Sequence, residues 1–159
     1  MEFNSKQIKI VIGLGNADKQ YNNTYHNVGF LAVDFLQNKI AIPTAKNNSY
    51  MNVSGADVAK AMKNHNAKPE ETIITHDDSD LTIGNYKLSF GSGAAGHHGV
   101  ESIQANLKTN DFWRLRIGIR PTSETVRQKA EEFVLKKISS ADKKILESVF
   151  EKISKELLK

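Results

Sequence analysis

The chain has 159 residues, of which 39% are hydrophobic and 25% are charged, a balance typical of one globular domain rather than of a disordered segment. It contains no cysteine, which excludes disulfides, thiolate catalysis and cysteine-ligated metals. Lys and Arg number 22 against 18 Asp and Glu, and this mild basicity permits a polyanionic partner but equally fits an ordinary solvated surface.

The first half of the chain alternates between short apolar runs and helical periodicity. Residues 8–12 form a largely apolar run, in which every residue except Lys9 is β-branched and apolar, and a glycine follows, which predicts a buried strand. Residues 28–38 carry apolar side chains at 3.6-residue spacing, which predicts a helix. Residues 40–46 are expected to form a short strand. A second helix is expected from residue 54 or 55 to about residue 64.

The second half continues the alternation. Buried or alternating apolar residues predict strands over 72–75, 86–90 and 114–119, and a helix is expected over 99–107. Residues 139–158 predict an amphipathic C-terminal helix. Its apolar face is expected to contain Ile145, Leu146, Val149, Phe150, Ile153 and Leu157. Strands alternating with helices predict an α/β fold, in which helices flank a mostly parallel central sheet.

The organisation of the chain is simple. It shows no repeat, low-complexity tract or linker, so we expect a single domain over residues 1–159. Residues 1–7 are polar, and no apolar run reaches the length of a membrane span. These features predict a cytoplasmic protein that does not bind membranes.

The most informative motif follows the first predicted strand. Residues 13–16 read Gly-Leu-Gly-Asn, and His26-Asn27 come ten residues later. Ligands bind at the carboxyl ends of strands in open α/β sheets, and a glycine turn there can bring Asn16 and His26 into one crevice. A dinucleotide site would need a third glycine where Lys19 and Gln20 stand. The motif therefore favours acid/base chemistry over a nucleotide cradle, with a strand-end turn beside a surface histidine as the simpler alternative.

Further blocks along the chain support the acid/base interpretation. They occupy residues 50–55, 76–81, 91–99 and 114–119. In this order and spacing, the blocks resemble bacterial peptidyl-tRNA hydrolase over most of the chain. That family cleaves the ester that joins a stalled peptide to tRNA. The resemblance implies a single α/β domain with a mixed central sheet, tRNA as partner, no cofactor and a monomer.

The resemblance assigns catalytic roles to a small set of residues. A positioned histidine that deprotonates water contributes about 10²–10⁴ in rate, and His26 is the expected general base. Asp77, directly after the histidine of its block, is expected to orient His26 and to stabilise its imidazolium. Asn16 and Asn52 are expected to hold the peptide end and the developing oxyanion. Asp78 and Asp80, in contrast, are expected to lie in a charged loop that caps a strand end.

Contacts to tRNA are expected at both aromatic and basic positions. Tyr21 and Tyr50 match positions that flank the 3′ end of tRNA, although a core aromatic is an equal alternative for each. Lys87 and Arg116 match positions that recognise a phosphate, with a solvated strand face as the alternative. Arg114 has no expected role.

The chain departs from the family pattern in several places. Residues 96–99 read Gly-His-His-Gly instead of Gly-His-Asn-Gly, so His98 replaces an asparagine that contacts substrate. Tyr25 replaces an arginine, and the region before Tyr50 is shorter than the family pattern. We therefore also consider a non-catalytic RNA-binding or partner-binding descendant of the fold, and a hydrolase of another acyl ester. No metal site is expected, because adjacent His97 and His98 cannot easily bind one ion.

Overall fold

A five-stranded sheet forms the centre of the fold, with strand order β2-β1-β3-β5-β4. The computed structural model describes residues 1–122, 124 and 127–158. The strands are β1 (Ile10–Gly13), β2 (Thr44–Lys46), β3 (Thr72–Thr82), β4 (Tyr86–Phe90) and β5 (Trp113–Arg120). Every neighbouring pair is parallel except β4 with β5, which confirms the expected mixed, mostly parallel sheet.

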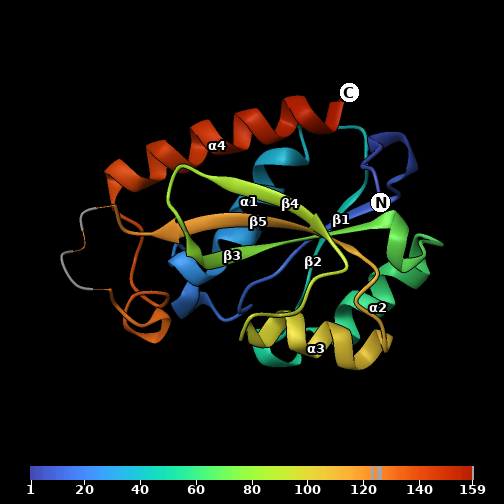
Figure 1. Ribbon diagram of the computed structural model, residues 1–159, viewed down its shortest axis with the longest axis horizontal. Coiled ribbons are helices and arrows are strands. Elements are labelled where there is room, and N and C mark those ends of the chain that lie inside the picture. The colour runs from blue at the N-terminus through green and yellow to red at the C-terminus, as the bar shows by residue number, and fades with distance from the viewer. Residues whose placement is uncertain (123, 125–126, 159) are drawn as a thin grey trace.

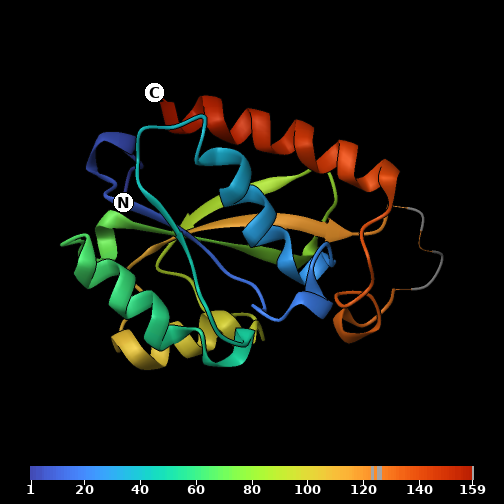
Figure 2. The ribbon, with the colours of Figure 1, turned by 180° about the vertical axis from the view of Figure 1, so that it is seen from behind.

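Helices cover both faces of the sheet (Figures 1 and 2). The α-helices are α1 (Val28–Leu36), α2 (Gly55–Asn64), α3 (His98–Leu107) and α4 (Ser140–Leu158). Single turns of 3-10 helix are η1 (Ser5–Gln7), η2 (Lys19–Tyr21), η3 (Tyr25–Asn27), η4 (Met51–Val53), η5 (Pro69–Glu71) and η6 (Ala130–Glu132). Helices α1 and α4 contribute to one apolar cluster, and α2 and α3 contribute to the other.

The two clusters follow from the alternation of side chains along each strand. In β1, Val11 belongs to the cluster under α1 and α4, whereas Ile10 and Ile12 belong to the cluster under α2 and α3. In β3, Ile73 and Ile74 divide between the two clusters in the same way. Both faces of these strands are therefore buried, which explains why they read as continuous apolar runs.

Most element bounds agree with the periodicity of the sequence, but β2, β3 and one face position of α4 differ. Strand β2 covers only Thr44–Lys46 of the expected residues 40–46. On α4, Ile145 was expected on the apolar face but is 39% exposed. The neighbouring residues Leu146, Val149 and Phe150 are buried, so Ile145 lies at the margin of the stripe.

Strand β3 is longer than the sequence indicates. The expectation that Asp78 and Asp80 lie in a charged loop is wrong, because β3 continues to residue 82. The register with β5 pairs Asp77 with Ile117 and Asp78 with Gly118. Strand propensity disfavours aspartate, but ladder pairing and contacts with arginines override it here.

An opening lies at one edge of the sheet, where β1 ends and the longer strand β3 continues. The last register pair between them joins Gly13 to Thr75, after which the chain of β1 turns away. Strand β3 continues, so Asp77 lies beyond the end of its neighbour. Ligands bind in α/β sheets at the carboxyl ends of parallel strands, and Asp77 occupies this position.

Helix α1 packs directly on the sheet at this opening, through Gly29. A Cβ atom on Gly29 would lie 2.5 Å from the Thr75 carbonyl oxygen and 2.6 Å from the Leu14 carbonyl oxygen. Both contacts are with backbone atoms, which cannot move aside without shifting the strands. The close approach places the residues just before α1 beside the part of β3 where β1 ends.

We predict that Gly29→Ala destabilises the fold by roughly 1–3 kcal/mol, the usual cost of overpacking a tight contact. Urea unfolding measures the change. Gly93→Ala is the matched control, because a Cβ atom at Gly93 would meet nothing within 4 Å. Equal stabilities of the two variants would contradict the close approach of α1.

Candidate active site

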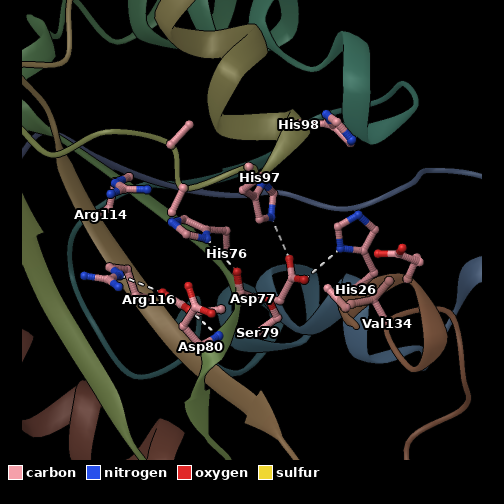
Figure 3. Close-up of a pocket in the computed structure, with 16 residues that line it drawn as sticks. His26, His76, Asp77, Ser79, Asp80, His97, His98, Arg114, Arg116 and Val134 are labelled. Atoms are coloured by element: carbon pink, nitrogen blue, oxygen red, sulfur yellow. Dashed lines mark hydrogen bonds and ion pairs between the residues drawn. The ribbon is translucent and has the colours of Figure 1, made fainter. Parts of the chain in front are cut away.

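Four elements bring polar side chains to the opening beyond β1 (Figure 3). Turn η3 carries His26, strand β3 carries Asp77, and the segment before α3 carries His97. Together with Arg114 and Arg116 of β5, these residues line a cavity of about 330 Å³. The segments that carry His26, Asp77, His97 and Arg116 therefore meet at this edge, whereas no residue of the blocks 13–16 and 50–55 lines the cavity.

His26 and Asp77 form a direct pair. The Nδ1 atom of His26 lies 2.8 Å from Oδ2 of Asp77. A carboxylate at Nδ1 holds the proton there and leaves Nε2 with its lone pair, the form that can accept a proton. The imidazole is partly exposed, so Nε2 is open to a water molecule in the cavity.

Burial disfavours the imidazolium form of His26 and by itself lowers its pKa. The negative charge of Asp77 and the hydrogen bond to it favour the imidazolium and outweigh burial, so the pKa of His26 is raised. A raised pKa makes the neutral imidazole of His26 a stronger proton acceptor.

Asp77 is buried and receives two imidazole groups. Its Oδ1 atom lies 2.8 Å from Nε2 of His97, and its Oδ2 atom bonds His26. Burial alone would raise the pKa of Asp77, but the charge on His26 and the hydrogen bonds from His26 and His97 hold it below its usual range. Asp77 is therefore an anion at working pH.

Backbone hydrogen bonds hold the turn that carries His26. The amide of His26 donates to the carbonyl oxygen of Val134 at 2.7 Å, and the amide of Tyr25 donates to that of Lys136 at 3.2 Å. The hydroxyl of Tyr25 donates to Asp142 in the first turn of α4. The segment before α4 thus fixes the base.

Asn16 is clamped by its neighbours. Asn27 donates from Nδ2 to the Asn16 carbonyl oxygen at 2.9 Å and accepts from the Asn16 amide at 2.8 Å. The Oδ1 atom of Asn16 accepts from the Met51 amide at 2.6 Å, which fixes the side-chain amide. Among the residues that the structure describes, none accepts from Nδ2 of Asn16; the residue itself is buried and is not part of the cavity lining.

The remaining predicted contacts lie around the cavity rather than in it. Tyr50 is exposed just before η4, Asn52 is exposed within η4, and Tyr21 is half-buried in η2. None of these three lines the cavity. His98 does line it, at its margin, where Nδ1 lies 3.4 Å from a carboxylate oxygen of Glu101.

The two predicted phosphate contacts are neighbours. Lys87 of β4 and Arg116 of β5 form a register pair in the antiparallel ladder, so their side chains leave the same face. Lys87 is exposed. Arg116 donates from Nε to Asp78 at 2.7 Å, and no other described residue accepts from its guanidinium, which leaves its terminal nitrogens for a phosphate.

Sequence reasoning missed two residues of this region. Arg114 is buried and donates to Ser92 Oγ and to the Gly93 carbonyl oxygen, both at 2.7 Å, so it anchors the glycine-rich segment. The two-residue spacing from Arg116 places both on one strand face, a signal that could have indicated Arg114. His97 was considered only as an unsuitable metal ligand, although its Nε2 atom forms a hydrogen bond with Asp77.

The donor atoms of His26, Asp77 and His97 all lie within 4.8 Å of one another. Two imidazoles and one carboxylate also occur as zinc ligands in proteins. The expectation of a metal-free site therefore stays a prediction at this point.

Comparison with known proteins identifies the family. Residues 10–49 and 41–159 match the family model described as "Peptidyl-tRNA hydrolase". A peptidyl-tRNA hydrolase of Nocardia farcinica is 37% identical over 158 residues, which cover 85% of this chain and 80% of that protein. The chain belongs to the peptidyl-tRNA hydrolase family. The resemblance that the blocks indicated is confirmed.

Other members of the peptidyl-tRNA hydrolase family agree in sequence and in structure. The protein of Aquifex aeolicus is 35% identical, with 91% of this chain and 85% of that protein covered. The crystal structure of peptidyl-tRNA hydrolase from Acinetobacter baumannii superposes with a TM-score of 0.83 at 26% identity, covering 98% of this chain and 89% of that one. Within the described part of the chain, no helix combines the length and apolarity needed to span a membrane.

We predict that Asp77→Asn lowers the titration midpoint of His26 below that of the parent. The asparagine removes the charge that raises the pKa and leaves burial, which lowers it. NMR of the imidazole ring against pH measures the midpoint. In the parent, the stability gained from the pair is fully present below the unfolded-state value of about 6.5 and is lost as pH rises through the raised folded-state pKa. A midpoint that Asp77→Asn leaves unmoved would disprove the assigned cause.

Proposed function

We propose that this chain hydrolyses the ester between peptide and tRNA in peptidyl-tRNA, with His26 as general base. The observation that carries the proposal is the pair of His26 and buried Asp77 in a cavity. A module that only binds RNA has no need of a buried carboxylate that raises the pKa of a partly exposed histidine. Membership in the peptidyl-tRNA hydrolase family supports the choice of ester.

The reaction begins with a water molecule between Nε2 of His26 and the ester carbonyl carbon. His26 takes a proton as the water oxygen bonds to that carbon, and Asp77 stabilises the resulting imidazolium. The carbon–oxygen bond to the ribose then breaks. The proton on Nε2 passes to the departing ribose oxygen, which returns His26 to its neutral form.

Two asparagines are proposed to orient the ester. The fixed amide of Asn16 is directed by its bond to the backbone of Met51, so its Nδ2 can donate to the carbonyl oxygen whose charge grows in the transition state. Asn52 is exposed on η4, one residue after Met51, where it can contact the peptide. We assign the oxyanion to Asn16 and the peptide chain to Asn52.

The tRNA is proposed to approach the cavity beside β4 and β5, where Lys87 and Arg116 lie. Lys87 and Arg116 would pair with a phosphate, and Tyr21 and Tyr50 would pack against bases or ribose at the 3′ end. His98, at the cavity margin, would donate to the substrate in place of the family asparagine. These contacts would set affinity, whereas His26 sets the rate of bond cleavage.

We further infer that the chain over residues 1–159 acts as one metal-free domain, as a monomer and in the cytoplasm. Every group of the proposed mechanism comes from one copy of the chain, so no partner subunit is needed. Peptidyl-tRNA arises in protein synthesis, which places the substrate in the cytoplasm.

We predict that the protein releases N-blocked amino acid from labelled tRNA in the presence of EDTA, and that His26→Ala lowers kcat by about 10²-fold or more. His65→Ala is the control, because His65 is exposed at the end of α2, away from the cavity. Tight tRNA binding without turnover in the parent would favour the non-catalytic RNA-binding alternative. Activity lost in EDTA and restored by Zn²⁺ would overturn the metal-free mechanism.

We predict that Lys87→Ala and Arg116→Ala each reduce the salt dependence of tRNA binding by about one unit of log–log slope, the contribution of one phosphate contact. Binding measured at several salt concentrations gives the slope. Lys144→Ala is the control, because Lys144 is exposed on α4 and has no described ion pair. Slopes unchanged in both test variants would show that Lys87 and Arg116 lie on an ordinary solvated strand face and do not contact a phosphate.

A further inference from the structure

We propose that His97 is a positioning residue for the reaction: a neutral Nε2–H donor, fixed in that tautomer by the start of α3, which sets the carboxylate of Asp77 for His26. This inference rests on the proposed role of His26 as general base. It assigns a function to a residue that was not among the predicted site residues.

Three hydrogen bonds determine the tautomer of His97. Its Nδ1 atom accepts from the backbone amides of Gly99 at 3.1 Å and Val100 at 3.3 Å. A nitrogen that accepts from N–H groups carries no proton of its own, so the single proton of the neutral ring is at Nε2. That atom lies 2.8 Å from Oδ1 of Asp77, where it donates.

The same side chain caps a helix. His97 has extended backbone angles and is the N-cap of α3, and its Nδ1 takes the place that a Ser or Asp oxygen usually holds. The first amides of a helix lack partners within the helix, so they hold the imidazole firmly in one orientation. The imidazole of His97 therefore links the start of α3 directly to Asp77 and restrains the position of its carboxylate.

Because His97 donates to one oxygen of the Asp77 carboxylate, each of the two oxygens bonds a different imidazole. Oδ1 of Asp77 is used by His97, which leaves Oδ2 for His26. His76 adds a backbone restraint, because its Nδ1 donates to the Asp77 carbonyl oxygen at 2.7 Å. Burial lowers the pKa of His76 to about 3, so His76 stays uncharged. His26 is thus the imidazole that gains and loses a proton beside Asp77.

The same tautomer opposes metal binding by the cluster of His26, Asp77 and His97. A Zn²⁺ ion would need the Nε2 lone pair of His97, so the proton would have to move to Nδ1. It would then point at the amides of Gly99 and Val100, and both cap bonds would be lost. The geometry that makes His97 a donor to Asp77 opposes metal binding.

Two substitutions separate the roles of the ring. His97→Asn places an acceptor near Nδ1 and keeps the cap, but it is too short to reach Asp77. His97→Gln places an amide N–H near Nε2 and keeps the donor, but it weakens the cap. We expect His97→Asn to lose about tenfold or more in kcat/KM and also some Tm, because one donor to the buried carboxylate is lost, whereas His97→Gln retains most activity and loses Tm through the weakened cap.

The pH profile provides a readout that a purely structural role would not move. Without the His97 donor, the carboxylate of Asp77 becomes more basic and holds the His26 proton more strongly. The acid limb of kcat/KM in His97→Asn should therefore move to higher pH. His97→Gln should keep the parental limb.

The opposite pattern, with His97→Gln inactive and His97→Asn fully active, would show that His97 serves only as a cap. If both variants lose all activity, the NMR titration of His26 still decides, because the midpoint should rise in His97→Asn and not in His97→Gln. Nitrogen-15 NMR of the parent must also show the Nε2–H tautomer, and an Nδ1–H ring would overturn the proposal. These NMR results do not depend on turnover, so they distinguish failure of this proposal from failure of the proposed function.

Discussion

The buried carboxylate of Asp77 is the constraint on which this part of the molecule depends. Moving a charge from water into a protein interior costs several kcal/mol unless donors surround it. The donors come from both faces of the sheet: His97 from the start of α3, and His26 from the turn before α1. The satisfied charge therefore joins the two helical layers at one point, and this is also the point where β1 ends.

Hydrogen bonds and ion pairs hold the charged groups in and beside the rest of the cavity wall. Asp78 bonds Arg116, Asp80 bonds Arg127, and the buried Arg114 bonds the glycine-rich segment. Because these pairs use the acidic groups of β3, the polar surface beside the catalytic pair is held in a defined arrangement. A polyanion that approaches it meets cations that are already oriented.

Local sequence patterns predicted the fold well where burial is regular. The bounds of β4 and α2 follow from alternation and from 3.6-residue periodicity, and β1 reads as a buried run because both of its faces are covered. The prediction failed for Asp78 and Asp80, since their place in β3 depends on pairing with β5. No local pattern contains that partner.

The candidate site shows the same division. The motifs indicated His26, Asp77 and Asn16, and the structure brings these residues to one edge. His97 could not be found in this way, because its role depends on a contact with Asp77, twenty residues away in sequence, and on the start of α3. Asn27 was visible as a neighbour of His26, but its clamp on the backbone of Asn16 requires the folded turn.

The segment that holds His26 has a consequence for the order in which the chain becomes active. The turn of Tyr25 and His26 takes its backbone partners from Val134 and Lys136, and its side-chain anchor from Asp142. All of these follow the last strand in sequence. A ribosome makes the N-terminal part first, so the central sheet can assemble while the base is still unanchored. His26, the proposed general base, then becomes anchored late in the chain's own synthesis, and a product that stopped before Val134 would contain every strand of the sheet but no backbone partners for His26 and Tyr25.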